Sequence, residues 1–234
     1  MFCITGRLPI PFQLPRIYPI LDSGTLARRG CDATMAAEAM IEAGARILQF
    51  RHKGHFSRAV FEQAARIAGL CRVAGAQFIV NDHADIALVL DAGLHVGQDD
   101  LPPASARALI GPSRLLGFST HNAGQLSQAT AEPADYLAIG PIFETGSKPD
   151  TAPLVGLAEL ERITRAARGC DAAGTAPPDL KPLAAIGGIT LGNARQVFAA
   201  GADSVAVIHG MLPEILTPQN IRTRMTAWLQ LATG

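Results

Sequence analysis

Short apolar segments alternate with longer segments of mixed polarity along most of this chain. The short segments carry adjacent apolar residues without helical spacing, as buried strands do. They predict strands at residues 16–21, 47–51, 77–81, 94–97, 115–119, 136–141, 182–187 and 204–208. The longer segments repeat apolar residues every three or four positions, as amphipathic helices do. They predict helices at residues 33–44, 57–74, 84–90, 104–110, 123–131, 157–168, 193–200 and 221–231.

The order of these units indicates the fold class. Parallel strands need a helical crossover, and strands buried on both faces read as continuous apolar runs. Eight strand–helix units predict an α/β protein, a single (β/α)8 TIM barrel of parallel strands over residues 16–234. An open, doubly wound sheet is the alternative. We expect residues 1–15 to form an N-terminal extension and residues 169–179, GCDAAGTAPPD, to be a loop insertion.

Composition narrows the range of partners. Among 234 residues, 20 Lys and Arg balance 20 Asp and Glu, so no positive excess favours nucleic acid or an anionic membrane. No apolar run approaches the ~18 residues of a membrane span, so we expect no membrane partner. The four cysteines include no CxxC pair, which favours reduced thiols, a cytoplasmic location and no zinc site. Any positive charge that matters for function must therefore be local.

Polar side chains follow the second, third and fourth predicted strands, at the end of a TIM barrel that holds the active site. Gln49, Arg51 and Lys53 alternate, so they share one side and predict a phosphate site. Asp82 and Asp100 follow the next two strands, and such a pair suits Mg²⁺ shared with phosphate oxygens. Each has an ordinary alternative: a solvated strand end for the cations, a helix N-cap for Asp82 and a turn for Asp100.

The fifth and sixth predicted strands are followed by hydroxyl groups and a further cation. Ser119 could donate to a phosphate oxygen, whereas His121 could be a base or simply a loop residue. Thr145, Ser147 and Lys148 lie on one loop. A loop that carries lysine suggests a lid over phosphate, and the alternative is an ordinary surface loop.

The last two strand ends predict a site built from backbone. Gly188 would let the main chain approach a ligand, and the loops after strands seven and eight form the usual phosphate site of such barrels. In the eighth loop this points to Ile208 and His209. Two anion sites in one barrel mouth predict a protein that binds two phosphorylated small molecules and joins them or transfers a group between them.

Seven motifs occur in a specific order: QFRHK at 49–53, NDHADIAL at 81–88, GLHVGQDDLP at 93–102, GFSTH at 117–121, DYLAIGPIFETGSK at 135–148, AIGGI at 185–189 and GADSVAVI at 201–208. With them the chain resembles thiamine phosphate synthases from about residue 18 to about residue 212. The resemblance implies that 4-amino-2-methyl-5-(diphosphooxymethyl)pyrimidine condenses with 4-methyl-5-(2-phosphoethyl)thiazole, or its carboxylated form. The products would be thiamine phosphate and pyrophosphate, formed by dissociative displacement.

The resemblance also implies roles for single residues. The pyrimidine diphosphate would be held by Gln49, Arg51, Lys53, Asn81, Ser119 and Lys148. The thiazole phosphate would be held by Thr145, Gly146, Ser147, Gly188, Ile208 and His209. The cofactor would be Mg²⁺ on Asp82 and Asp100, and the catalytic groups would be Arg51, Lys53, Ser119 and Lys148. Their catalytic task would be to stabilise the charge of the departing pyrophosphate.

Three positions depart from the family pattern. His83 stands where the family commonly has Arg, Ser147 replaces a second Thr, and His209 replaces a Ser. Two alternatives therefore stay open: the thiazole tautomerase of the same family, and a barrel that binds ligands without catalysis. Apolar residues on the outer helices are compatible with a homodimer, but the sequence locates no interface.

Overall fold

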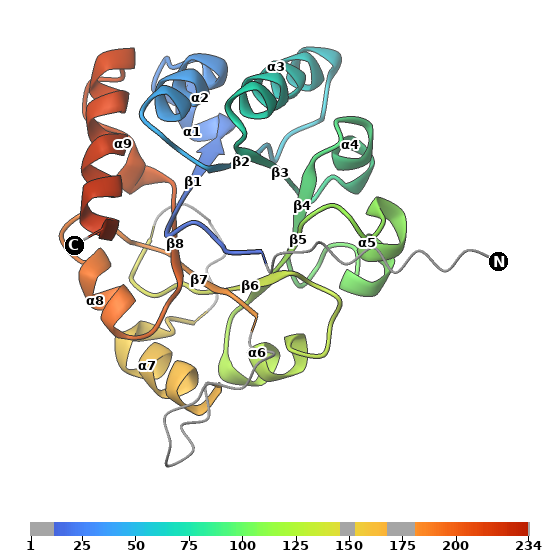
Figure 1. Cartoon of the computed structure of the whole chain (residues 1–234), viewed down its shortest axis with the longest axis vertical. Coiled ribbons are helices and arrows are strands. Elements are labelled where there is room, and N and C mark those ends of the chain that lie inside the picture. Colours follow the sequence, from blue (N-terminus) through green and yellow to red (C-terminus); the bar gives the residue numbers. More distant parts are fainter. Residues whose placement is uncertain (1–11, 146–152, 168–180, 234) are drawn as a thin grey trace.

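The computed structural model of the chain describes residues 12–145, 153–167 and 181–233. Its eight strands close into a barrel in chain order, and every neighbouring pair is parallel (Figure 1). The strands are β1 Ile17–Asp22, β2 Ile47–Arg51, β3 Gln77–Asn81, β4 Gly93–Val96, β5 Leu116–Thr120, β6 Tyr136–Ile139, β7 Leu183–Ile186 and β8 Ser204–Val207. The closed ring confirms the predicted TIM barrel and excludes the open sheet.

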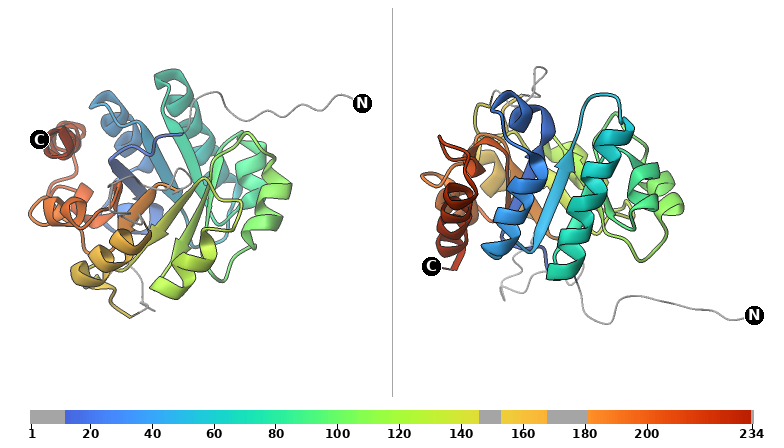
Figure 2. Two further views of the ribbon diagram at one scale, coloured as in Figure 1. Left: turned by 60° about the horizontal axis from the view of Figure 1, so that its bottom comes forward. Right: turned by 90° about the horizontal axis from the view of Figure 1, so that it is seen from above.

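Helices surround the ring of strands on the outside (Figure 2). They are α1 Ser23–Arg28, α2 Ala33–Glu42, α3 Arg58–Ala74, α4 Ala84–Val89, α5 Pro103–Ile110, α6 Ala123–Ala129, α7 Gly156–Ala167, α8 Ala194–Ala199 and α9 Pro218–Thr233, with a 3-10 turn η1 at His209–Met211. The sequence pattern missed α1, because six residues are too few to show a helical period. Instead Asp22 begins this helix, with its carboxylate accepting the Thr25 amide at 2.8 Å.

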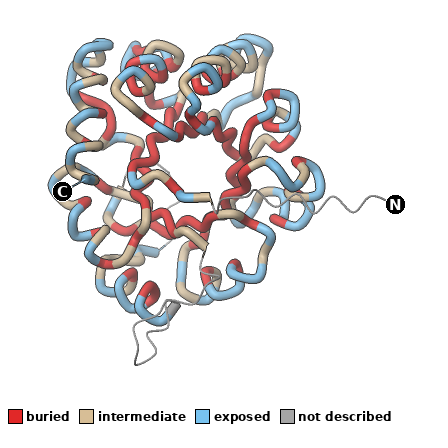
Figure 3. The backbone as a smooth tube through the Cα atoms, viewed as in Figure 1, coloured by how far each residue is buried: buried red, intermediate tan, exposed pale blue. Residues whose placement is uncertain are grey.

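Two apolar layers hold the barrel together, one outside the strand ring and one within it. The outer layer packs helices on strands, so buried residues line the ring while exposed residues face outward on the helices (Figure 3). The inner layer consists of Leu14, Tyr18, Ile20, Ile47, Ile79, Leu115, Tyr136, Ala138, Ala184 and Ala206. Strand residues of one parity therefore point inward, which carries Asp22, Arg51, Asn81 and Ser119 to the C-terminal mouth of the barrel.

Residues 12–15, which we expected to belong to the N-terminal extension, pack against the start of the barrel. Leu14 is buried in the inner layer, and the Phe12 ring lies 6.3 Å from the ring of Tyr136. The Ser204 hydroxyl donates to the Pro15 carbonyl at 2.7 Å. This short segment therefore covers the end of the barrel opposite the predicted site. Within the described ranges, no helix is long and apolar enough to cross a membrane.

Candidate active site

Arg51 and Asp22 form an ion pair between the C-terminal ends of β2 and β1. The two residues are register partners, and only 11% of each side chain is exposed. Burial opposes ionisation of Asp22, but hydrogen bonds from Thr25 and the nearby Arg51 guanidinium outweigh it and lower the pKa of that carboxyl. Asp22 therefore stays charged and orients Arg51. Sequence reasoning missed this residue, although a carboxylate directly after a strand was the signal used for Asp82.

Replacing Asp22 with asparagine is expected to reduce both stability and turnover. Asparagine keeps the helix cap but leaves Arg51 without its counter-charge, which should cost about 1–3 kcal/mol at pH 7. A carboxyl with a lowered folded-state pKa stabilises the fold above its ordinary pKa of 3.8, and this contribution is lost as the pH falls through the lowered value. The difference between D22N and wild type in urea denaturation should therefore shrink below about pH 4.

The matched control for this variant is Asp135→Asn. Asp135 pairs with Arg107 at 2.6 Å and lies just before β6, at the opposite end of the barrel. D135N should lower stability without changing turnover, whereas D22N should lower turnover about 10-fold as Arg51 loses its orientation. Equal turnover in D22N and wild type would contradict an orienting role for Asp22.

Gln49 lies one layer deeper than Arg51, inside the barrel. It is 3% exposed, and its amide nitrogen donates to the Tyr18 hydroxyl at 2.9 Å. The alternation along β2 does place both residues on the inner side, as the sequence predicted. Because Gln49 lies deeper, it would contact the innermost part of a ligand bound in the mouth. Arg51 and Lys53 lie nearer the opening.

Lys53, Asp82 and Asp100 form a charged cluster across the loops after β2, β3 and β4. Lys53 makes an ion pair with Asp82, and the Gly97 amide donates to Asp100 at 2.7 Å. Burial and then the neighbouring Asp82 carboxyl raise the pKa of Asp100, against the opposing effects of the Gly97 amide and Lys53. Two carboxylates held this close repel each other unless positive charge lies nearby.

The backbone at Asp82 is strained, which ties this residue to a defined geometry. Its φ of +65° lies in the left-handed region that few residues other than Gly, Asn and Asp adopt. Its amide donates to the His95 carbonyl at 2.8 Å, and the adjacent His83 ring packs 4.8 Å from Phe56. His83, rather than Asp82, occupies the position before α4, so the helix-cap alternative for Asp82 is wrong.

Asn81 and Ser119 offer polar hydrogens at the mouth. Asn81 is 7% exposed, and its amide nitrogen has no acceptor among the described residues. A buried donor without a partner is costly, so it points to an acceptor supplied by a ligand. Ser119 is half-buried, with its hydroxyl 2.8 Å from Nε2 of His95. His121 is held by the Gly140 carbonyl at 2.8 Å from Nδ1, which supports its assignment as a loop residue.

The loops after β6 and β7 pack tightly against one another. Gly188 has a φ of +63°, and a Cβ there would lie 2.5 Å from the Glu144 carbonyl oxygen. Gly188 is therefore required first by this close approach of two backbones. The Asn193 side chain donates to the Gly188 carbonyl at 3.0 Å, a support that sequence reasoning did not identify. The half-buried Thr145 ends the described part of the β6 loop.

The eighth loop turns immediately after its strand. Ile208 is half-buried, and the exposed His209 begins the 3-10 turn η1. Gly146, Ser147 and Lys148, which the sequence predicted for the two substrates, lie outside the described residues. The described residues therefore include those predicted for the pyrimidine substrate except Lys148, and, of those predicted for the thiazole substrate, Thr145, Gly188, Ile208 and His209.

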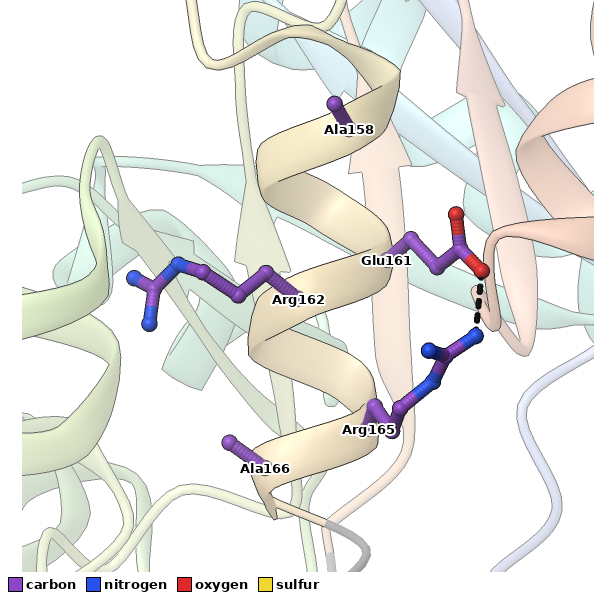
Figure 4. A pocket seen from close by; sticks show the side chains of 5 residues that line it. All are labelled: Ala158, Glu161, Arg162, Arg165 and Ala166. Atoms are coloured by element: carbon purple, nitrogen blue, oxygen red, sulfur yellow. Dashed lines mark hydrogen bonds and ion pairs between the residues drawn. The ribbon is translucent and has the colours of Figure 1, made fainter.

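A separate hollow lies on the outer surface of α7, away from the barrel mouth (Figure 4). It is lined by Ala158, Glu161, Arg162, Arg165 and Ala166. Arg165 pairs with Glu161 at 2.5 Å, and Arg162 pairs with Glu159 at 2.6 Å, each along the same helix. Such pairs are typical of a solvated helix face, so this hollow is no candidate for the chemistry.

A parallel barrel with cations, amides and carboxylates at its C-terminal mouth is typical of enzymes that bind phosphorylated small molecules. Residues 17–211 match the family model described as thiamine monophosphate synthase. The chain therefore belongs to the thiamine monophosphate synthase family. This confirms the resemblance drawn from the seven motifs.

Similar proteins cover most of the chain. The thiamine-phosphate synthase of Chloroflexus aurantiacus is 42% identical over 198 residues, 84% of this chain and 85% of the relative. That of Roseiflexus castenholzii is 41% identical over 211 residues, 89% of this chain and 86% of the relative. The solved structure of thiamine phosphate pyrophosphorylase from Pyrococcus furiosus has a TM-score of 0.75 at 28% identity, covering 93% of this chain and 95% of that chain.

Proposed function

We propose that this protein is a thiamine phosphate synthase, a transferase that joins the pyrimidine diphosphate to the thiazole phosphate and releases pyrophosphate. Relatives that carry the synthase name align over more than four-fifths of the chain, which favours the synthase over the tautomerase. The observation that carries the proposal is the cluster of Lys53, Asp82 and Asp100 beside Arg51 and Asn81. A diphosphate would supply the acceptor that Asn81 lacks and oxygens for Arg51 and Lys53, and Mg²⁺ would offset the repulsion between Asp82 and Asp100.

The diphosphate would interact with the cationic side of the mouth. Arg51 offers a planar fork of donors that suits phosphate oxygens, and Lys53 offers a point charge. The unpartnered amide of Asn81 would donate to one of these oxygens. Gln49, deeper in the barrel, and Ser119, at the mouth, would hold the pyrimidine ring end of the same substrate, and Lys148 would complete the set.

Asp82 and Asp100 suit Mg²⁺ by the chemistry of their oxygens and by their mutual repulsion. Magnesium favours one or two carboxylates together with water and substrate phosphates. When bound, it would neutralise charge on the pyrophosphate and help it to leave. Lys53 already pairs with Asp82, so we expect it to turn toward the diphosphate when the metal binds.

The thiazole phosphate would lie on the opposite side of the mouth. Backbone groups at Gly188 and at Ile208-His209 would bind its oxygens, with hydroxyl and amide donors from Thr145, Gly146 and Ser147. The ring nitrogen would thereby face the methylene carbon of the pyrimidine. In the reaction the C–O bond to pyrophosphate breaks and a C–N bond to the thiazole forms, so the protein mainly positions the substrates and stabilises charge.

A coupled assay on the purified full chain tests this proposal. Both substrates are added with Mg²⁺, or with EDTA followed by excess Mg²⁺, and thiamine phosphate is followed by fluorescence after oxidation. We expect product with Mg²⁺, none with EDTA, and recovery when Mg²⁺ is restored. Isomerisation of the thiazole without condensation would identify a tautomerase. Binding of both substrates without either reaction would identify a barrel that binds ligands without catalysis.

A further inference from the structure

A continuous chain of hydrogen bonds crosses the interior of the barrel beneath the candidate site. The Gln49 amide nitrogen lies 2.9 Å from the Tyr18 hydroxyl, and the hydroxyls of Tyr18 and Tyr136 lie 2.8 Å apart. Nδ1 of His95 lies 3.1 Å from the Tyr136 hydroxyl, and Nε2 of His95 lies 2.8 Å from the Ser119 hydroxyl. The chain thus begins and ends at two residues that the proposed function assigns to the pyrimidine substrate.

These hydrogen bonds all have the same donor-to-acceptor direction, from Gln49 toward Ser119, and this follows from counting hydrogens. The Gln49 amide nitrogen can only donate, so the Tyr18 oxygen accepts from it. Burial raises the pKa of both Tyr18 and Tyr136, so each phenol keeps its single hydrogen. A buried hydroxyl hydrogen needs an acceptor, so the Tyr18 hydrogen goes to the Tyr136 oxygen. The Tyr136 hydrogen then goes to Nδ1 of His95.

The same count of hydrogens determines the tautomer of His95 and the direction of its hydrogen bond with Ser119. A neutral imidazole has one donor and one acceptor, so an accepting Nδ1 places the hydrogen on Nε2. Nε2 of His95 then donates to the Ser119 oxygen. The hydrogen of the Ser119 hydroxyl is left to point elsewhere, and Ser119 is the half-buried member of the chain, at the mouth.

The contact between His95 and Tyr136 requires a glycine at position 117. A Cβ on Gly117 of β5 would lie 2.4 Å from both Nδ1 of His95 and the Tyr136 hydroxyl oxygen. Any other residue at position 117 would therefore separate or displace the two groups. The Tyr136 ring also packs 5.6 Å from the His95 ring and 5.9 Å from the Tyr18 ring. The glycine and the ring packing together hold His95 in one orientation.

We propose that His95 is a positioning residue, held as the neutral Nε2–H tautomer by Tyr136, which makes the Ser119 hydroxyl a hydrogen-bond donor toward the substrate. This inference rests on the proposed function only for the identity of the substrate that Ser119 meets. His95 itself does not contact the substrate. A donor that already points at the substrate site does not have to be reoriented when the substrate binds, which is the advantage of such preorganisation.

The tautomer can be measured directly on the wild-type protein. Nitrogen-15 NMR of the labelled chain separates protonated from unprotonated imidazole nitrogens, and the His95→Gln spectrum assigns the resonances of His95. We expect protonated Nε2 and unprotonated Nδ1 at neutral pH, and a loss of this preference in Tyr136→Phe. An Nδ1–H tautomer would mean that the hydrogen bonds run in the opposite direction, with Ser119 donating to His95, and would overturn the inference.

Kinetics then test whether His95 acts through Ser119. His95→Leu and Ser119→Ala should each lower kcat/KM about 10-fold or more, because each removes the oriented donor. The double variant should resemble Ser119→Ala alone, since two residues that act through one hydroxyl are not additive. His95→Gln keeps an amide donor near the Nε2 position and should recover most of the activity. Additive losses, or no recovery with Gln, would contradict the positioning role.

The two readouts separate this inference from the proposed function. An inactive wild-type protein with the Nε2–H tautomer would overturn the synthase and support the hydrogen-bond arrangement. An active protein with the Nδ1–H tautomer would support the synthase and overturn the role of His95.

Discussion

Arg51→Ala is expected to lower kcat about 10²-fold or more, because it removes a donor to the charge that develops on the departing pyrophosphate. Arg51 is well placed for this task, since its side chain is 11% exposed and is oriented by Asp22. The loss should appear mainly in kcat, because the charge increases between the bound substrate and the transition state. Steady-state kinetics with each substrate varied in turn would measure the separate effects on kcat and KM.

Arg51→Ala also leaves the buried Asp22 carboxylate without its partner, so stability must be measured alongside activity. Kinetics should be recorded at a temperature where urea denaturation shows the variant to be folded. Arg51→Lys keeps the charge but not the two-pronged geometry and should recover only part of the turnover. Arg162→Ala removes an exposed arginine paired with Glu159 on the outer face of α7 and should leave kcat unchanged. Near-normal turnover in Arg51→Ala would exclude the assigned role.

Asp82→Asn is expected to weaken the apparent affinity for Mg²⁺ by at least 10- to 100-fold, the loss typical when even a supporting residue of a metal site is changed. Turnover at low Mg²⁺ should fall in proportion, and high Mg²⁺ should restore part of it. Asparagine is the appropriate substitution, because it tolerates the left-handed backbone that Asp82 adopts at φ +65°. Alanine would add backbone strain to the loss of charge.

The measurement is a titration of turnover with Mg²⁺ in wild type, Asp82→Asn, Asp100→Asn and Asp85→Asn. Asp85 is a nearby carboxylate in the first turn of α4, so it controls for a general change of charge. We expect the first two variants to shift the Mg²⁺ dependence and Asp85→Asn to match wild type. The same Mg²⁺ dependence in all four proteins would place the metal elsewhere.

The sequence predicted the architecture well, because burial sets a pattern that local sequence must carry. Strands inside a ring of helices are apolar on both faces, and eight such runs separated by amphipathic helices allow few other folds. The missed helix α1 and the packed residues 12–15 had too short a pattern to detect. The polar residues at the strand ends could also be predicted, since a polar residue directly after an apolar strand segment is evident from the sequence.

The hydrogen-bond and ion-pair partners of these polar residues could not be predicted from the sequence. Arg51 was predicted to bind an anion, yet in the protein it pairs with Asp22, 29 positions earlier in the chain. Gln49 was assigned to the same opening as Arg51, but it lies deeper and bonds to Tyr18. His95 looked like one polar residue in an apolar strand, and Tyr136 is 41 positions away.

The sequence by itself determined the class of fold, the family, and the end of the barrel at which the polar groups would collect. All three follow from local order: period, motif and position after a strand. Only the tertiary structure decided which of those groups meet, because closing the barrel staggers each strand against its neighbour and brings distant strands face to face inside the ring. The ion pair of Arg51 with Asp22 and the hydrogen-bonded chain through His95 exist only after that closure.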